Sequence, residues 1–503
     1  MLRFLPMCVF LFAATSVSAQ QEGPISVPRG QAQLFVDDFL IDTQADLKRT
    51  LHQPKKDDGG NIPVIALENE FGGLPATLEA NGTIVYDPRL KKHVMFALAF
   101  CPSGAGGDRV RNYRFTSADG MSWIKGDDGT PQQVQFDLTD AASGKSGVSD
   151  LFSCYYDTGD PNFPYKGWIN IWFLPELDGI HYFQSKDGKT WERGNRVARF
   201  MSRAIQQDGR KVSGPSDVTV FYHDAVANRF LASIKFFGQP VPPGNSLRSR
   251  AYAFLDKLNA PLAMESIDHI ALLPKAAAAD GDMPFDEYYG STAWRYESLW
   301  LGGLKVWHGQ GDYPYSAAGC AFLKRAVSRD GLNWRKVQFN NDASVPEVFI
   351  PNGAEGGKGG RNDGGYMTEF SQGPLRIGDE LIFYYGSSSF GKNEPTGKRV
   401  SGGGIFRARL RQDGFVSVDG GTLTTRPLRL EGHELFVNGI GPITVTLLDG
   451  KGAALGSAEV TGDSLRHKVS FAGKRIGDAL RDNTGRLRFT VLEGGRLYSL
   501  ETR

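Results

Sequence analysis

The sequence predicts an all-β protein, a five-bladed β-propeller followed by a C-terminal β-sandwich. Two observations carry this prediction: one turn phrase recurs along the chain, and a set of short strand-like segments recurs with nearly the same period. Helical patterns are few, and the best candidates, AVANRF and KRIGDALRD, are short. The 62 glycines and an aromatic content of 11% suit a turn-rich β fold.

The recurring turn has the form SxDGxxW. Its copies are SADGMSW at 117–123, SKDGKTW at 185–191 and SRDGLNW at 328–334. Asp-Gly between β-type runs marks a tight hairpin, because Gly adopts positive φ without strain and Asp binds backbone amides of the turn. The interval from the second copy to the third is about twice the interval from the first to the second. We therefore interpret the turn aspartates as structural: Asp119, Asp187 and Asp330.

A second repeat precedes the turns. Segments 77–100, 149–173 and 216–237 each contain an acidic residue, a short β-rich run, a Tyr, an Asp, a loop and another β-rich run. Segments 296–308 and 368–386 fit the pattern more loosely. Five units of about 70 residues, each with several short strands, indicate five propeller blades.

The two ends of the chain differ from this pattern. Residues 1–19 read as a secretory signal, with Arg3, an apolar stretch and a small-residue cleavage site at Val17-Ser18-Ala19. We expect the propeller over 20–415 and the sandwich over 416–503, where alternating strands continue without the Trp turn. A sixth blade is the alternative for the last segment. The mature protein is expected to be secreted or periplasmic.

Charge and composition exclude several function classes. The 57 basic residues nearly balance the 56 acidic ones, and no basic stripe favours nucleic acid or an anionic membrane surface. After the signal, no apolar run of about 18 residues predicts a membrane span. No histidine pair has metal-ligand spacing, and the Gly-rich loop at 351–369 is not a phosphate loop. We predict no cofactor and no metal.

Each unit supplies one early carboxylate. These are Glu79, Asp150, Asp217, Glu297 and Glu369, which recur at roughly the interval of the units. The innermost strands of a propeller converge on a central funnel, so these side chains are expected to meet there. Cleavage of a glycosidic bond requires such a group: one acid protonates the leaving oxygen, and a carboxylate opposite activates water or attacks the sugar.

The chain resembles the five-bladed β-propeller glycosidases, the invertase, arabinanase and anhydro-galactosidase group. The SxDGxxW turns and the acidic-strand units carry this resemblance. LFVDDFLID at 34–42, RTLHQP at 49–54 and RLRQDGFVSVDGG at 409–421 are similar to exported, invertase-like bacterial proteins. The WMNDPNG-type opening and the Arg-Asp-Pro motif of invertases are absent.

The resemblance implies roles for the carboxylates. By position, Glu79 is the base or nucleophile, and Asp150 is the modulator that raises the pKa of the acid. The acid is Asp217, or Glu297 if Asp217 instead binds sugar hydroxyls. Further expected substrate contacts are Glu369, Trp294, Arg295, Arg361, Asp363 and Asp38.

Three functions are compatible with these residues. The leading hypothesis is a secreted glycoside hydrolase that acts on a polysaccharide or oligosaccharide. A non-catalytic glycan-binding propeller is the alternative. The third is a lyase, with a Tyr or His base and an Arg that neutralises a uronate, or a phosphorylase, which needs a basic cluster in the funnel; Arg295 and Arg361 are its visible candidates.

Overall fold

The computed structural model describes residues 23–67, 77–100, 110–238, 246–275, 281–284, 286–309, 318–340, 347–357, 360–393, 403–480 and 482–503. Nearly all regular structure in these ranges is β. The described helical elements are one turn of α-helix, α1 (Ile476–Ala479), and two 3-10 turns, η1 (Asp57–Gly60) and η3 (Met264–Ser266). Among the described residues, no helix has the length and apolar character needed to cross a bilayer.

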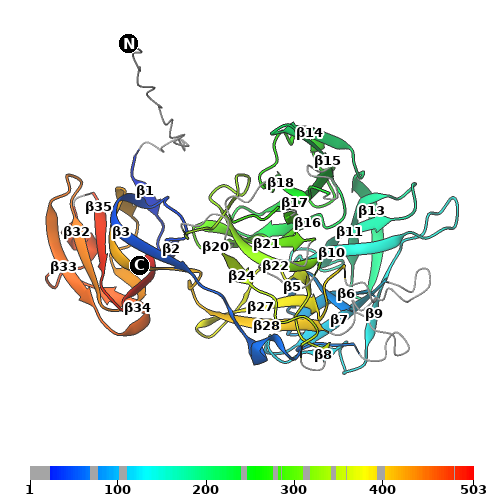
Figure 1. The fold of residues 1–503 in the computed structure, drawn as a ribbon, viewed down its shortest axis with the longest axis horizontal. Helices are drawn as coiled ribbons and strands as arrows, with labels where there is room; N and C mark the ends of the chain where they lie inside the picture. The colour runs from blue at the N-terminus through cyan, green and yellow to red at the C-terminus, as the bar shows by residue number, and fades with distance from the viewer. Residues whose placement is uncertain are drawn as a thin grey trace, which may run out of the picture.

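Most strands fall into groups that pair antiparallel in chain order (Figure 1). The first group is β5 (Thr77–Asp87), β6 (Lys92–Phe100), β7 (Val110–Ser117), β8 (Ile124–Lys125) and β9 (Gln132–Phe136). The second is β10 (Val148–Tyr156), β11 (Tyr165–Trp172), β12 (Gly179–Ser185) and β13 (Thr190–Ala198). A short parallel pairing between β9 and β13 joins the outer edges of these two groups.

The following groups repeat this arrangement. The third is β16 (Val220–Asp224), β17 (Arg229–Gly238) and β18 (Ser249–Leu255), with the hairpin β14 (Arg203–Gln207) and β15 (Arg210–Gly214). The fourth is β19 (Asp286–Ser291), β20 (Trp294–Tyr296), β21 (Leu299–His308), β22 (Cys320–Ser328), β23 (Arg335–Lys336) and β24 (Val348–Ile350). The fifth is β25 (Tyr366–Phe370), β26 (Leu375–Ile377), β27 (Glu380–Ser388), β28 (Gly404–Arg411) and β4 (Lys55–Lys56).

These groups close into a ring. The first strand of one group contacts that of the next, from β5 to β10 and from β10 to β16. β17 and β18 contact β19, β21 contacts β25, and β25 returns to β5. The leading strands therefore surround a common axis, as the sequence repeat predicts.

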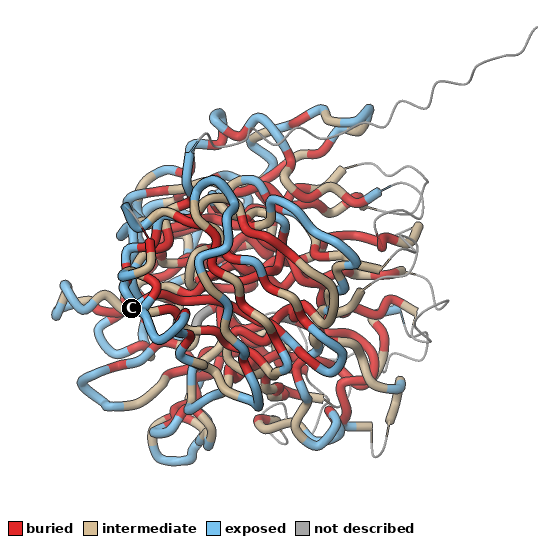
Figure 2. Tube along the Cα trace, turned by 90° about the vertical axis from the view of Figure 1, so that its left-hand side faces the viewer, coloured by how far each residue is buried: buried red, intermediate tan, exposed pale blue. Residues whose placement is uncertain are grey.

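The hydrophobic core is divided among the gaps between neighbouring groups. One cluster joins the first and second groups through Phe96 and Phe152, and another joins the second and third through Trp168 and Phe221. Three further clusters fill the remaining gaps around the ring. Both faces of most strands are therefore covered, which explains their long runs of apolar residues. In Figure 2 the buried segments run through the interior, and the exposed ones lie mainly at its outside.

The repeated turn has the predicted structure. Gly331 has a φ of +84°, and the Asp330 carboxylate accepts hydrogen bonds from the backbone amides of Leu332 and Asn333 at 2.8 and 2.7 Å. Trp334 folds back over the turn and donates from Nε1 to the Gly331 carbonyl at 2.7 Å. The other two copies bind their turn amides through Asp119 and Asp187. The three turns follow β7, β12 and β22, respectively, and each leads into the next strand of the chain. Each of these strands is the third of its group when the strands are counted in the order in which they pair.

The last part of the chain forms a separate sheet with its own core. Its strands are β29 (Val416–Thr425), β30 (Leu428–Leu430), β31 (Leu435–Ile440), β32 (Ile443–Leu448), β33 (Ala454–Val460), β34 (Asp463–Val469), β35 (Thr484–Val491) and β36 (Arg496–Thr502). Apolar residues of these strands form one buried cluster. Figure 1 shows this sheet beside the ring.

The N-terminal strands join that sheet, which differs from the expected boundary. β1 (Ile25–Val27) pairs with β30, β2 (Gln33–Leu34) with β36, and β3 (Ile41–Leu51) with β29. The sequence pattern predicts this segment to be part of the propeller. The apolar residues Phe35 and Leu40 explain the difference, because they are fully buried in the core of the C-terminal sheet.

Candidate active site

One pocket lies where the leading strands of the ring begin. Its volume is about 250 Å³. Its walls come from all five strand groups: Thr77 and Glu79 in β5, Asp150 in β10, Asp217 before β16, Tyr289 in β19 and Tyr366 in β25. The opposite ends of several of these strands line a different cavity, which includes Val85 and Tyr222. The pocket is therefore at one end of the ring axis.

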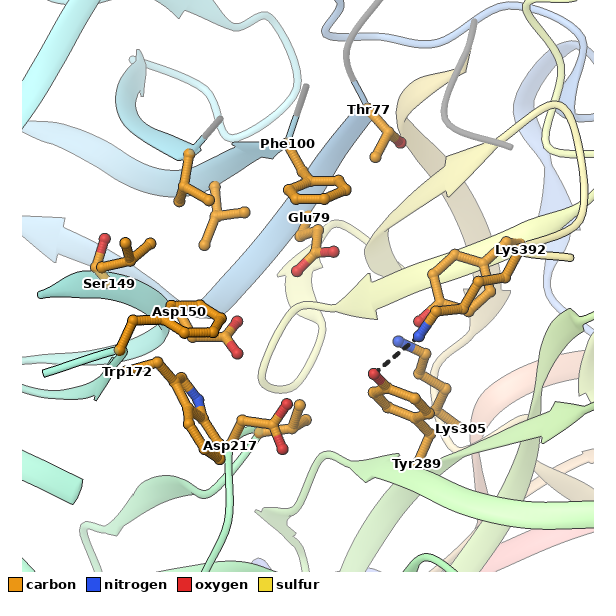
Figure 3. Close-up of a pocket in the computed structure, with 16 residues that line it drawn as sticks. Thr77, Glu79, Phe100, Ser149, Asp150, Trp172, Asp217, Tyr289, Lys305 and Lys392 are labelled. Carbon is orange, nitrogen blue, oxygen red and sulfur yellow. Dashed lines mark hydrogen bonds between the residues drawn. The ribbon is translucent and has the colours of Figure 1, made fainter. Parts of the chain in front are cut away.

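Three of the predicted carboxylates meet in this pocket. Glu79, Asp150 and Asp217 line it together, and Figure 3 shows all three directed toward the same space. All three are partly exposed to that space. They belong to three successive units of the chain, so only the closed ring brings them together. The Asp150 carboxylate also accepts the backbone amide of Leu151 at 2.8 Å, which fixes its rotamer.

The loop that carries Asp217 has an unusual backbone. Val218, which follows it, has a φ of +57°, a conformation that β-branched residues rarely adopt. The buried Arg250 guanidinium donates to the Val218 carbonyl at 3.0 Å and to the Ser233 hydroxyl at 2.8 Å. Thr219 further closes the loop by donating to the Ser216 carbonyl at 2.7 Å. Such imposed strain is concentrated at functional sites, and here it positions Asp217.

Asp217 forms an ion pair with Lys235 of β17. The Lys235 ammonium donates to Asp217 Oδ1, which also accepts the Ser216 hydroxyl at 2.7 Å. Burial favours the neutral acid, but the Lys235 charge and hydrogen bond outweigh it, so the pKa of Asp217 is below its ordinary value. Asp217 is therefore a carboxylate near neutral pH.

The wall opposite the carboxylates is basic and aromatic. Tyr289 is at its centre, and its hydroxyl accepts a hydrogen bond from Lys392 at 3.0 Å (Figure 3). Within the described part of the chain, four cationic groups lie over its ring, at 4.4 to 4.7 Å from the centroid: Lys235, Arg248, Lys305 and Lys392. Arg248 is paired with Glu287, and Lys305 donates to the Thr368 carbonyl.

This concentration of positive charge changes the ionisation of Lys392. Burial, together with Arg248, Lys305 and Lys235, lowers the pKa of Lys392 to about 7, although Glu79 acts in the opposite direction. Burial also raises the pKa of Tyr289 well above its usual value, so Tyr289 is a neutral phenol. Lys392 is thus a pocket group whose charge changes near physiological pH.

Aromatic side chains line the remaining side of the pocket. Trp172 ends β11 and stacks on Phe200 with ring centroids 4.2 Å apart. Phe173 follows it at a φ of +64° and is 81% exposed. Phe100 of β6 also lines the pocket. Exposed aromatic faces beside carboxylates suit a sugar, because the apolar face of a sugar ring packs on an aromatic plane.

Glu297 does not reach the pocket, which corrects its prediction as a catalytic residue. It occupies the tight turn between β20 and β21 with a φ of +52°. Its carboxylate accepts the Ala32 amide at 3.0 Å and pairs with Arg376. It thereby ties the N-terminal segment to the ring. The spacing in the sequence already indicated the error. Tyr289 follows Asp217 by about one repeat interval, whereas Glu297 follows Asp217 by more than one interval.

Trp294 and Arg295 also lie outside the pocket. Trp294 is 8% exposed and packs against Phe370 and Phe383 in the core. The Arg295 guanidinium lies 5.9 Å from the Trp300 ring, away from the three carboxylates. Both residues come after β19 in the chain, beyond the part of that strand that lines the pocket.

The other predicted substrate contacts divide into three cases. Asp363 is fully buried, pairs with Lys56 at 2.6 Å and accepts the Tyr385 hydroxyl at 2.8 Å, so its role is structural. Asp38 is exposed and pairs with Arg49 at 2.6 Å, and Arg361 is exposed outside the pocket lining. Glu369 belongs to β25, but its side chain is outside the described part of the structure.

The sequence did not predict the basic wall, although two of its lysines follow the repeat. Lys235 and Lys305 stand one repeat interval apart, in the strands LASIKFF and GGLKVWH. The Trp172–Phe173 pair also stood within a recognised unit. Lys392 follows β27 in a loop that has no repeat signal. Within the described ranges, no group of three or more His, Cys, Asp or Glu residues could hold a metal ion.

Comparisons with known proteins add structural neighbours. No family model and no curated protein matches the chain. Among solved structures, it is similar to a glycoside hydrolase family 43 arabinoxylan arabinofuranohydrolase from Bacillus subtilis, at 11% identity and a TM-score of 0.41, over 88% of this chain and 99% of the other. A protein described under the GH130 family of mannoside phosphorylases, which contains hydrolases of β-1,2-mannosidic linkages in Candida mannan, has 14% identity and a TM-score of 0.42, over 74% and 96%.

A third neighbour is a family 117 glycoside hydrolase from the marine bacterium Zobellia galactanivorans. Its identity is 9% and its TM-score 0.38, over 72% of this chain and 89% of that one. Each of the three descriptions names a glycoside hydrolase or a family that contains glycoside hydrolases.

Proposed function

We propose that this protein is a glycoside hydrolase that cleaves glycosidic bonds of a polysaccharide or oligosaccharide in the pocket of Glu79, Asp150 and Asp217. The single observation that supports this most is the meeting of three carboxylates, from three separate strand groups, beside exposed aromatic rings. Hydrolysis requires a proton donor and a carboxylate on opposite sides of the bond. A binding protein would require neither.

The ion pair with Lys235 suggests how the roles divide. Asp217 is held as a carboxylate, which suits a base, a nucleophile or a stabiliser of positive charge on the sugar. This argues against Asp217 as the acid, the role that the family resemblance implied for it. Glu79 or Asp150 then donates the proton to the leaving oxygen. Water supplies the hydroxyl that replaces it at the sugar carbon.

The proposal includes the organisation of the whole chain. We infer a five-bladed β-propeller that begins after β3 and ends near residue 415, and a β-sandwich formed by residues 416–503 together with the N-terminal strands β1 to β3. The ring of strand contacts and the separate C-terminal core support this division. We also propose export to the periplasm or the medium after cleavage behind Ala19; the N-terminal sequence of the mature protein would test it.

The function is tested by turnover on a panel of plant and algal glycans. Products of the wild type are identified by chromatography, and their anomeric form is followed by NMR. Glu79→Gln and Asp150→Asn are compared with Glu297→Gln, a matched change at a carboxylate outside the pocket. Loss of turnover only in the first two supports the hydrolase. Glycan binding without any turnover by the wild type would instead support the binding protein.

The proton donor is identified with an activated leaving group. A substrate with a good leaving group, such as a nitrophenyl glycoside, needs little protonation. The variant of the acid therefore recovers most of its rate on this substrate, whereas the variant of the other carboxylate does not. Recovery by Asp217→Asn would contradict the role given to Asp217.

A further inference from the structure

We propose that Arg250 is a positioning residue of the pocket: by binding the backbone of two of its walls at once, it holds Asp217 at a fixed place relative to Tyr289. The inference rests on the proposed function, since Asp217 and Tyr289 border the space in which the sugar would be cleaved. It goes beyond that function, because it assigns a role in the reaction to a buried side chain outside the pocket lining.

The guanidinium of Arg250 contacts two segments that are far apart in the chain. Arg250 belongs to β18 and is fully buried. One of its terminal nitrogens donates to the Val218 carbonyl at 3.0 Å, and the other donates to the Tyr289 carbonyl at 3.4 Å. Val218 follows Asp217 directly, and Tyr289 is in β19 of the next strand group. One side chain thus connects the backbone beside a pocket carboxylate to the backbone of the wall opposite.

The shape of the arginine side chain suits it to this connection. A guanidinium is planar and presents five N–H donors in fixed directions, so it can bind acceptors of different segments at the same time. Ser233 fixes the group itself, because the nitrogen that binds Val218 also donates to the Ser233 hydroxyl at 2.8 Å and to the Ser233 carbonyl at 3.1 Å. Ser233 belongs to β17, the strand that pairs with β18. The sheet therefore sets the position of the guanidinium, and the guanidinium sets that of the loop.

The loop that carries Asp217 needs such contacts to keep its conformation. Val218 has a φ of +57°, which costs a β-branched residue free energy and persists only where the surroundings impose it. Lys235 lies directly opposite Arg250 in the pairing of β17 with β18. Lys235 binds the side chain of Asp217, and Arg250 binds the carbonyl of the next residue. Two neighbouring side chains of one sheet thus hold two successive residues of the loop.

The same contacts fix the place of Asp217 relative to Tyr289. Both residues contact Lys235, whose ammonium binds the Asp217 carboxylate and lies 4.7 Å from the centroid of the Tyr289 ring. Figure 3 shows Asp217 and Tyr289 bordering one cavity from different strands. Because these strands belong to separate groups, the gap between the two residues depends on contacts between the groups, and the bond from Arg250 to the Tyr289 carbonyl is one of them.

Amide hydrogen exchange tests this connection without any need for turnover. It compares the wild type with Arg250→Lys, because lysine keeps the positive charge but is a point donor that cannot bind both carbonyls. Exchange is expected to become faster in the peptides that cover residues 215–222 and 286–291. Ser233→Ala is a milder change that removes one acceptor of the guanidinium, and it should have a smaller effect in the same two segments. Wild-type exchange of both segments in both variants would overturn the proposal.

Arg325→Lys is the matched control. Arg325 is also fully buried, in β22 of the fourth group. Its guanidinium donates to the Gly302 carbonyl at 3.2 Å and lies 3.5 Å from the centroid of the Phe349 ring, outside the pocket lining. Both arginine variants are expected to melt at a lower temperature than the wild type, but only Arg250→Lys should change exchange in the two pocket segments. Equal changes in both variants would indicate a general loss of stability and would overturn the proposal.

Steady-state kinetics then test the positioning role, at a temperature well below the melting point of every variant. A displacement of a reacting group by about 1 Å can reduce the rate about 100-fold. Arg250→Lys is therefore expected to lower kcat about tenfold to 100-fold and to change KM less than about threefold, since the side chains that contact the substrate remain. Arg325→Lys should keep the wild-type kcat. A wild-type kcat in Arg250→Lys would contradict the positioning role.

The two readouts separate this inference from the proposed function. Faster exchange of the two pocket segments in Arg250→Lys, together with no cleavage of any glycan by the wild type, would keep the connection through Arg250 and reject the hydrolase. Glycan cleavage that Arg250→Lys retains in full, with unchanged exchange, would reject the role of Arg250 and keep the hydrolase.

Discussion

The Asp217 carboxylate and the Lys235 ammonium form an ion pair in the wall of the pocket. Lys235 is 4% exposed and Asp217 is 21% exposed, so neither group is well solvated. The pair connects the strained loop before β16 to the second strand of the same group. It fixes the charge of one pocket carboxylate, and its lysine is one of the cations that lie over the Tyr289 ring.

Breaking this pair on one side is expected to destabilise the fold. Lys235→Met leaves the Asp217 charge partly buried without its partner, which we expect to cost about 2–4 kcal/mol in the free energy of unfolding. The double variant Lys235→Met/Asp217→Asn should regain much of that loss, since it leaves no unpaired charge. Denaturant unfolding of both proteins measures this. A double variant as unstable as the single one would contradict the explanation.

Removal of either remaining pocket carboxylate is expected to abolish most activity. Glu79→Gln and Asp150→Asn should each reduce kcat about 10²- to 10⁴-fold, the usual effect of losing a general acid or base. Their melting temperatures should stay near that of the wild type. Glu297→Gln should retain turnover but unfold at a lower temperature, because Glu297 holds Ala32 and Arg376 together.

Phe173 is expected to act in substrate binding alone. The side chain is 81% exposed at the pocket, so Phe173→Ala should scarcely change stability. Loss of a stacking surface should raise KM for an oligosaccharide about fivefold to tenfold, with little change in kcat. Val226→Ala is a suitable control, since Val226 is 77% exposed in the turn between β16 and β17. Steady-state kinetics on the two variants distinguishes the effects.

Lys392 is expected to make stability depend on pH. Its pKa of about 7 in the folded protein lies below the ordinary value of 10.5, so the unfolded chain binds more protons between these values. The free energy of unfolding contributed by this group therefore rises as pH increases from 7 toward 10.5. Lys392→Met should flatten the rise. Unfolding curves at pH 7 and 9 for both proteins measure it, and parallel pH profiles would count against the assignment.

The repeated turn is expected to contribute to stability through its aspartate. Asp330→Ala removes an acceptor of two backbone amides, and we expect a loss of about 1 kcal/mol, reduced by solvent exposure. Burial raises the pKa of Asp330, but hydrogen bonds from Asn333 and Leu332 outweigh it and keep the pKa below its ordinary value. The difference from wild type should thus be present above pH 3.8 and disappear as pH falls through the folded-state pKa. Asp256→Ala, at an exposed aspartate directly after β18, is the control.

The periodic features of this protein follow from local sequence chemistry. The turns at 117, 185 and 328 need only a positive-φ Gly and an Asp that binds amides, so they formed as predicted. Glu79, Asp150 and Asp217 also follow the period, so the sequence identifies them as equivalent positions, and closure of the ring brings them to one pocket.

Other positions do not follow the repeat, and their place in the structure is decided by tertiary packing. Glu297 has the right chemistry but lies in a turn, and Tyr289 takes the pocket position of its group. Lys392 enters the pocket from a loop, and β1 to β3 cross to the C-terminal sheet. The physical reason is ring closure: contacts between residues far apart in the chain depend on which faces pack together, and no local propensity records them.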